Sequence, residues 1–250
     1  MMLATISRAL AAAVLLGTVG FPITTSAQWL NWTDETNNHR WSDDRNWNLS
    51  RRPIATDDGV ALAALPGPTI SGTAAAVQGF VNVGAGGDAR LTITNKGSLT
   101  VKIAVTLGCS DGATGTLVME PGSQLKADQI YIGNGGADFG ARGVLMLNGG
   151  TIDCTHFSVL RARALRSEAR VSLMDGTVRC WDFFLNRDSI RPPRVDIWRG
   201  KIVQRRNDVK RIQDWVHSKW IVGYGGKGRV VVEFDTPAHP ACTVIRAIRD

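Results

Sequence analysis

The sequence has few cysteines and histidines, and their spacing does not match a metal site. The four cysteines include no Cys-x-x-Cys pair, and the four histidines include no pair separated by three or four residues. Structural zinc sites draw on such closely spaced ligands. The sequence also lacks a Gly-x-Ser-x-Gly nucleophile elbow and a phosphate-binding glycine loop that ends in Gly-Lys-Ser or Gly-Lys-Thr. We therefore predict no bound metal and no cofactor.

Long apolar runs are also absent after residue 27, so no membrane span is predicted there. Within residues 1–27, Arg8 precedes an apolar run from Ala9 to Val19, and small residues follow at Thr25-Ser26-Ala27. This order is typical of a secretory signal peptide, and the run is too short to cross ~30 Å of hydrocarbon. We expect cleavage after Ala27 and a secreted mature chain, extracellular or at the cell surface, with the periplasm as an alternative.

Between Phe80 and Val203 the chain repeats itself about every 26 residues. In each repeat a glycine is followed, two or three residues later, by an aliphatic anchor. The anchors are separated by 26, 27, 26 and 24 residues and are Leu99, Leu125, Ile152, Val178 and Ile202. A second apolar strand begins, at intervals of 24, 25, 27 and 26 residues, with Val81, Val105, Ile130, Phe157 and Phe183. Two series with one period predict a repeat fold in which no unit buries its own apolar face.

Each repeat is predicted to contain three short strands. In the repeat that begins at Leu91, apolar and polar residues alternate over 91–94, 98–101 and 103–107, with a turn at Asn95-Lys96-Gly97. Alternation between glycine-containing turns indicates β-strands. Three strands per repeat predict one triangular turn, with equivalent strands paired in parallel at ~4.8 Å. We predict an all-β protein, a right-handed parallel β-helix (β-solenoid) of about six turns.

An antiparallel β-sandwich also contains many short strands, but it does not require equivalent residues to match one turn apart. Two residues after the first four anchors stand small or apolar residues, namely Val101, Ala127, Cys154 and Cys180. One residue after the same anchors stand Thr100, Lys126, Asp153 and Arg179. The last three of these alternate in charge, an order that contributes ~0.2–1 kcal/mol for each exposed pair. Both columns favour the solenoid.

A solenoid exposes unpaired strand edges at both ends and therefore needs caps. We predict four parts: a signal peptide over 1–27, an N-terminal cap over 28–66, a β-solenoid over 67–206 and a C-terminal cap over 207–250. The N-terminal cap holds four of the eight tryptophans. The C-terminal cap is expected to be a helix followed by a hairpin of two strands over 229–235 and 243–248. The helix should begin near Asn207-Asp208 and place on one side Val209, Ile212, Val216 and Trp220.

Positive charge gathers in the later repeats. Residues 161–211 contain 14 Lys or Arg against 6 Asp or Glu. We predict a basic face that binds an acidic polysaccharide or another polyanion, with a merely solvated face as the alternative. Trp181 and Trp198 are candidate sugar platforms if they are exposed. The candidate ligand-binding residues of the basic face are Arg161, Arg163, Arg166, Arg187, Arg191, Arg194, Arg205 and Arg206.

Cys154 and Cys180 lie 26 residues apart in one inward column, near the separation that a disulfide requires. A disulfide is compatible with secretion. Two buried thiols are the favoured interpretation, because parallel neighbours seldom offer the geometry of a disulfide.

A glycosidase needs a pair of carboxylates, and the stacked columns contain no such pair. The neighbours of Asp153 in its column are Lys126 and Arg179. No catalytic residue is predicted. A polysaccharide lyase with an arginine-rich groove stays open as an alternative.

Short motifs at both ends of the mature chain resemble those of a known group. Trp41-Ser42-Asp43, Asn46-Trp47, Pro53 and Asp57-Asp58-Gly59-Val60 resemble the opening of exported repeat proteins of planctomycete-type bacteria, of the autotransporter-passenger-like or PEP-CTERM-associated kind. The segment from Trp220 to Gly228 resembles their ending. The resemblance implies a β-helical extracellular protein and no particular reaction.

Together these observations predict a secreted, non-enzymatic β-solenoid with a structural or adhesive role at the cell surface or in the extracellular matrix. End-to-end self-association into fibres is a further expectation. The alternative is a protein that binds acidic polysaccharide, or a lyase that cleaves it.

Overall fold

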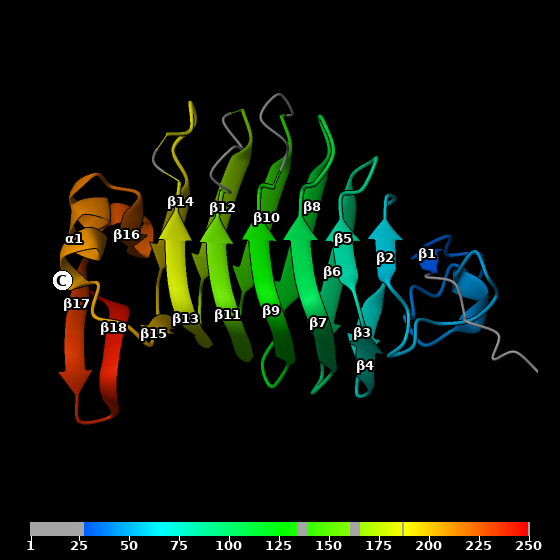
Figure 1. Cartoon of the computed structure of the whole chain (residues 1–250), viewed down its shortest axis with the longest axis horizontal. Helices are drawn as coiled ribbons and strands as arrows, with labels where there is room; N and C mark the ends of the chain where they lie inside the picture. The colour runs from blue at the N-terminus through cyan, green and yellow to red at the C-terminus, as the bar shows by residue number, and fades with distance from the viewer. Residues whose placement is uncertain (1–27, 135–139, 161–165, 187, 250) are drawn as a thin grey trace, which may run out of the picture.

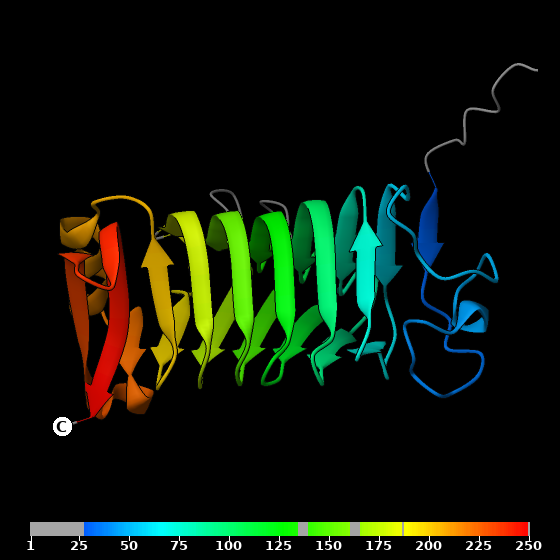
Figure 2. The same cartoon turned by 90° about the horizontal axis from the view of Figure 1, so that it is seen from below.

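The computed structural model describes residues 28–134, 140–160, 166–186 and 188–249. The protein is all-β, with 54% strand and one helix near its C-terminal end, and its strands wind into a β-solenoid of about seven turns. Figures 1 and 2 show the turns following one another along the long axis. The predicted β-solenoid is confirmed. Within the described residues, no helix has the length and apolar character needed to cross a membrane.

The first of three faces consists of one short strand from each turn. Each strand pairs in parallel with its equivalent in the next turn. Along the stack these strands are β3 (Thr69–Ser71), β6 (Ala89–Thr94), β8 (Thr114–Met119), β10 (Arg142–Leu147), β12 (Glu168–Leu173), β14 (Arg194–Ile197) and β16 (Ile221–Gly223).

Four long strands bend near their middle and so contribute to the other two faces. They are β7 (Ser98–Leu107), β9 (Gln124–Ile132), β11 (Thr151–Val159) and β13 (Thr177–Leu185). The bend is visible in the pairing of β7, which follows β4 (Ala74–Val77) with its first half and β5 (Phe80–Val83) with its second. The first halves, with β4 and β15 (Lys201–Gln204), form the second face. The second halves form the third face, which is turned to the viewer in Figure 1.

The stack extends past its predicted bounds at both ends and has about seven turns instead of six. Inside the predicted C-terminal cap, β16 pairs in parallel with β14. Inside the predicted N-terminal cap, β2 (Gly59–Leu62) pairs in parallel with β5, and β1 (Trp29–Asn31) pairs in parallel with β2. Between β1 and β2 the chain is irregular, so no period marks these two strands in the sequence.

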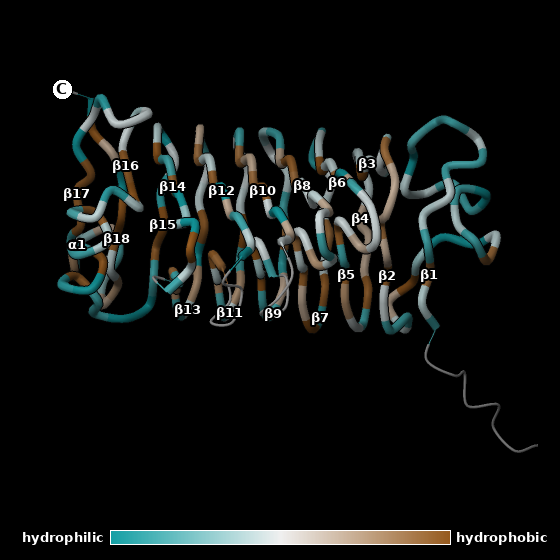
Figure 3. The backbone as a smooth tube through the Cα atoms, turned by 90° about the horizontal axis from the view of Figure 1, so that it is seen from above, coloured by the Kyte–Doolittle hydropathy of each residue, from teal (hydrophilic) through white to brown (hydrophobic). Residues whose placement is uncertain are grey.

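The predicted anchors lie in one buried column. Ile152 pairs with Leu125 on one side and with Val178 on the other, and all five anchors are at most 1% exposed. The second series is buried in the same way, and Phe157 stacks next to Phe183 with ring centroids 5.8 Å apart. Figure 3 shows the resulting hydrophobic segments recurring along the turns. Since the repeats contribute side chains to one continuous core, each turn depends on its neighbours.

Aromatic residues close the N-terminal end. Trp32, Trp41 and Trp47 are buried, and Trp47 contacts the other two rings edge-on, at centroid distances of 5.1 and 4.9 Å. The Trp47 indole N–H donates to the Trp41 carbonyl oxygen at 2.9 Å. Next to this cluster lies the short helix η1 (Asp44–Asn46).

The C-terminal end carries the predicted helix and hairpin. Helix α1 (Val209–His217) buries Ile212 and Trp215, and the Trp215 ring meets Phe183 edge-on at 5.5 Å. The sequence pattern predicts Val216 and Trp220 on the buried side, and both pack against the core, although they are only partly buried. Trp215 lies there as well and is buried more deeply. After η2 (Tyr224–Gly226), β17 (Gly228–Thr236) and β18 (His239–Arg249) form an antiparallel hairpin, and β18 continues the second face by pairing with β15.

Glycine corners join the third face to the first. Gly108 has φ +69°, and a Cβ atom there would lie 2.3 Å from the Arg142 carbonyl oxygen. One turn later Gly133 has φ +73°, and at the next equivalent position Leu160 keeps the same conformation with φ 61°. Early corners therefore need glycine for two reasons, the positive φ and the close approach of the next turn.

The corner geometry predicts unequal effects of two glycine substitutions. Gly112→Ala is expected to cost about 1 kcal/mol of unfolding free energy, because Gly112 has φ +68° but a Cβ atom added there would meet no atom within 4 Å. Gly108→Ala should cost at least about twice as much, because a backbone clash adds to the conformational strain. Denaturant unfolding followed by circular dichroism measures both. Equal losses would contradict the proposed packing of the corner.

Candidate functional site

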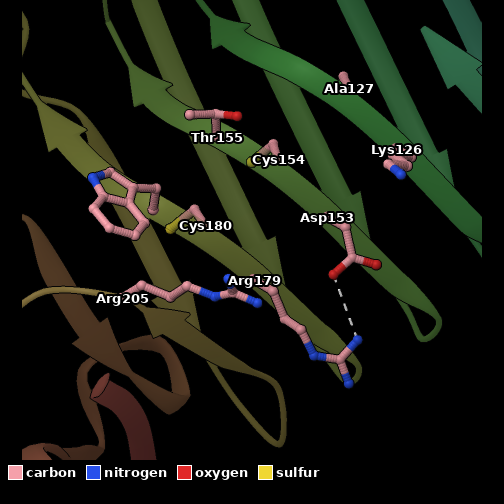
Figure 4. Close-up of a pocket in the computed structure, with 9 residues that line it drawn as sticks. Lys126, Ala127, Asp153, Cys154, Thr155, Arg179, Cys180 and Arg205 are labelled. Atoms are coloured by element: carbon pink, nitrogen blue, oxygen red, sulfur yellow. Dashed lines mark ion pairs between the residues drawn. The ribbon is translucent and has the colours of Figure 1, made fainter. Parts of the chain in front are cut away.

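Two adjoining hollows lie at the bend between the second and third faces. Their volumes are about 320 and 480 Å³. They share Lys126, Ala127 and Thr155 in their walls and so form one depression, which we call the central groove. It extends along the stack from β4 to the residue that follows β15, and Figure 4 shows the hollow near β15.

The floor of the central groove is a column of small side chains. Ala127, Cys154 and Cys180 pair with one another across β9, β11 and β13. Both cysteines are free thiols in the structure, on neighbouring strands. Burial raises the pKa of the Cys180 thiol to about 12 and that of Cys154 well above its usual value. A neutral thiol is a poor nucleophile, so these residues supply shape to the groove and not reactivity.

Charged side chains line the walls. The register confirms the column in which Asp153 stands between Lys126 and Arg179. Arg179 contacts Asp153 at 3.6 Å, but both side chains are more than half exposed, so the pair contributes only ~0–1 kcal/mol. Within the described residues, neither Lys126 nor Arg205 forms an ion pair. The groove therefore presents cations that are free to contact a ligand.

Arg205 directly follows β15 and extends to the part of the groove where Arg179 lies (Figure 4). Lys102 adds a fourth cation in the other hollow, and Asp128 joins Asp153 as a second carboxylate. A hydrogen bond from Thr155, together with one from Gln129, lowers the pKa of Asp128. The groove thus holds more positive than negative charge, without being uniformly basic.

Trp181 supplies an exposed aromatic surface in the groove, since it lines the hollow and is 54% exposed. The other candidate platform, Trp198, is half-buried against Tyr224, with ring centroids 5.4 Å apart. Of the two, Trp181 is the one placed to stack against a ligand.

The described members of the predicted basic face lie in different places. Arg205 lines the central groove, whereas Arg206 contacts Asp182 at 3.2 Å and Asp208 at 3.8 Å. Arg191 and Arg194 line a separate hollow on the first face. Arg166 is exposed just before β12. The remaining members, Arg161, Arg163 and Arg187, lie outside the described residues.

Sequence reasoning did not assign Lys126, Arg179 and Trp181 to one groove. The sequence does contain a signal for this groove, namely a break in the alternation of apolar and polar residues between the two halves of a long strand such as β11. In β11 the break falls at Thr155. Cys154 before it pairs with Cys180, and His156 after it pairs with Asp182, but Thr155 itself has no partner in the register. Such a break in the alternation marks a bend, and the side chains on either side of it converge.

The described residues contain no group of three or more His, Cys, Asp or Glu side chains that could hold a metal ion. Comparisons with protein-family models, curated proteins and solved structures find no match to this chain. The function must therefore be argued from the geometry of the groove.

Thiol labelling tests the floor of the groove. In a Cys109→Ser, Cys242→Ser variant, Cys154 and Cys180 should react with iodoacetamide at pH 8 on the order of 100-fold more slowly in the native protein than in denaturant, because burial keeps both thiols neutral. Mass spectrometry of the labelled protein gives both rates. Comparable rates would show that the thiols are accessible and ionised in the native groove.

Proposed function

We propose that the protein is a non-enzymatic, adhesive β-solenoid that holds an extended acidic polysaccharide in the central groove. The observation that carries this proposal is that Lys126, Arg179 and Arg205 line one hollow, next to the exposed ring of Trp181. Cations attract carboxylate or sulfate groups, and the ring offers a flat surface to the apolar side of a sugar.

The repeat sets the spacing of these contacts. Neighbouring strands of one face lie ~4.8 Å apart, so Lys126 on β9 and Arg179 on β13 are separated by roughly 10 Å along the axis. Arg205 follows one strand further. A chain polymer with regularly spaced negative charges can therefore meet several cations without bending the protein.

Binding requires little rearrangement of the protein. A ligand carboxylate would compete with Asp153 for Arg179, and that exposed ion pair is weak. The attraction is electrostatic and exposed to solvent, so salt should weaken it strongly.

The proposed location is the cell surface or the extracellular matrix. The signal-like sequence of residues 1–27 supports secretion, and the resemblance to exported planctomycete-type repeat proteins agrees with it. A rigid stack with one binding groove suits an adhesive or scaffolding role better than the handling of a small molecule.

Binding to a polyuronate column tests the proposal. The protein should be retained at low salt and elute steeply as salt rises. Lys126→Gln with Arg205→Gln should weaken binding at least about tenfold, since each hydrogen bond from a charged group contributes about 1.5–3 kcal/mol. Trp181→Ala should weaken it about two- to tenfold. A matched control, Lys210→Gln with Arg229→Gln, removes two exposed charges that line neither hollow of the groove.

Three results would count against the proposal. Elution of the wild-type protein at trivial salt would exclude polyanion binding, and equal retention of groove and control variants would move binding away from the groove. Release of unsaturated sugar, seen by ultraviolet absorbance, would establish a lyase in place of an adhesive protein.

End-to-end assembly is a second candidate property, favoured by the outer strands of the second face. Among the described residues β4 pairs only with β7, and β17 pairs with β18 and at a single residue with β16. Unpaired strand edges at opposite ends can join copies head to tail into open filaments. Size-exclusion chromatography over a range of concentrations should then show growing assemblies, whereas a monomer at every concentration would exclude them.

A further inference from the structure

A hollow on the first face gathers three arginines on a different side of the solenoid from the central groove. Its volume is about 570 Å³, and Arg170, Arg191 and Arg194 line it together with Glu168 and Asp196. We call it the arginine hollow. β12 and β14 form its base, and the segment just before β14 supplies Arg191.

Two of these arginines stand directly opposite each other. Arg170 on β12 pairs in register with Arg194 on β14, and both side chains are exposed. Like charges in directly opposed positions destabilise a sheet. Within the described residues neither arginine forms an ion pair with a carboxylate, and Arg194 has one long hydrogen bond, 3.5 Å, to the Gly225 carbonyl oxygen.

The nearby carboxylates have partners other than Arg170 and Arg194. Glu168 contacts Arg191, and Arg142 lies 3.8 Å from its other oxygen. Asp196 accepts a hydrogen bond from the Gly225 amide at 2.9 Å, which ties it to η2. Among the residues that the structure describes, the Arg170–Arg194 pair therefore has no carboxylate of its own to balance its positive charge.

The two opposed arginines, Arg170 and Arg194, belong to the later turns of this column. In the same outward column the earlier turns carry Arg90, Thr116 and Val144, so Arg90 has an uncharged neighbour. Nothing in the repeat pattern requires two stacked arginines, which points to a ligand as the reason for the pair.

We propose that the arginine hollow is a second binding site for anionic sugar groups, so that one molecule bridges two polysaccharide strands. Planar guanidinium groups on neighbouring strands can share one carboxylate or sulfate through charge-assisted hydrogen bonds. The bridging role rests on the proposed function of the central groove, whereas the hollow as an anion site does not. Two sites on separate faces let a rigid monomer crosslink a matrix.

Isothermal titration with an oligogalacturonate too short to reach both sites tests the number of sites. The wild-type protein should bind two molecules, and Arg170→Ala with Arg194→Ala should bind one. Lys126→Gln with Arg205→Gln should also bind one, through the remaining site. The control pair Arg90→Ala with Arg229→Ala, which removes the same charge at exposed positions, should still bind two. Circular dichroism and thermal unfolding check that all variants are folded.

Light scattering of long polygalacturonate mixed with the protein tests bridging. Wild-type protein should crosslink the polymer, while each two-residue site variant should bind it without crosslinking. Unchanged stoichiometry and crosslinking in the Arg170→Ala, Arg194→Ala variant would overturn the inference. If the Lys126→Gln, Arg205→Gln variant binds as the wild-type protein does, while the Arg170→Ala, Arg194→Ala variant no longer binds, the anion site in the hollow stands and the groove proposal fails.

Discussion

The structure depends on the register between successive turns. Parallel pairing places Leu125, Ile152 and Val178 directly on one another in the interior, so every turn completes the burial of the turn before. A shift by one residue would turn this whole column outward, because side chains alternate along a strand. The period of about 26 residues is thus the spacing that keeps the apolar columns continuous.

The same register creates the surfaces that can bind ligands. Outward residues also stack in columns, so a charge at one position acquires neighbours from the turns on either side. On the second face this produces the alternating column of Lys126, Asp153 and Arg179. On the first face it produces two adjacent arginines, Arg170 and Arg194. Binding surfaces on a solenoid are therefore lines along the axis, which suits polymers.

The groove arises from a local departure from regularity. β9, β11 and β13 each bend where one residue leaves the ladder, and β7 bends where two residues leave it. The small side chains of Ala127, Cys154 and Cys180 lie beneath that bend. Larger residues in this column would fill the depression. At the far end of the column Gln204 is fully buried and reaches Asp208, so the core becomes polar just where the C-terminal cap begins.

Much of the fold could be predicted from the sequence because every repeat adds evidence for the same strand pattern. Five anchors at one period indicate parallel stacking more strongly than any single strand does, and the helix after Asp208 follows from its own periodicity. β1 and β2 escaped prediction because they pair across an irregular segment that carries no period. Trp215 was not predicted on the buried side of the helix, because its burial depends on contact with Phe183 in another turn.

The site was less predictable than the fold. Composition alone determined that the later turns are rich in arginine, and spacing determined which residues share a column. Only the tertiary structure decided that Arg205 joins Lys126 in the groove while Arg194 lies on another face with Arg170. The physical reason is that a sequence period reports which residues stack, whereas the bends and corners that set the direction of each face depend on contacts between turns.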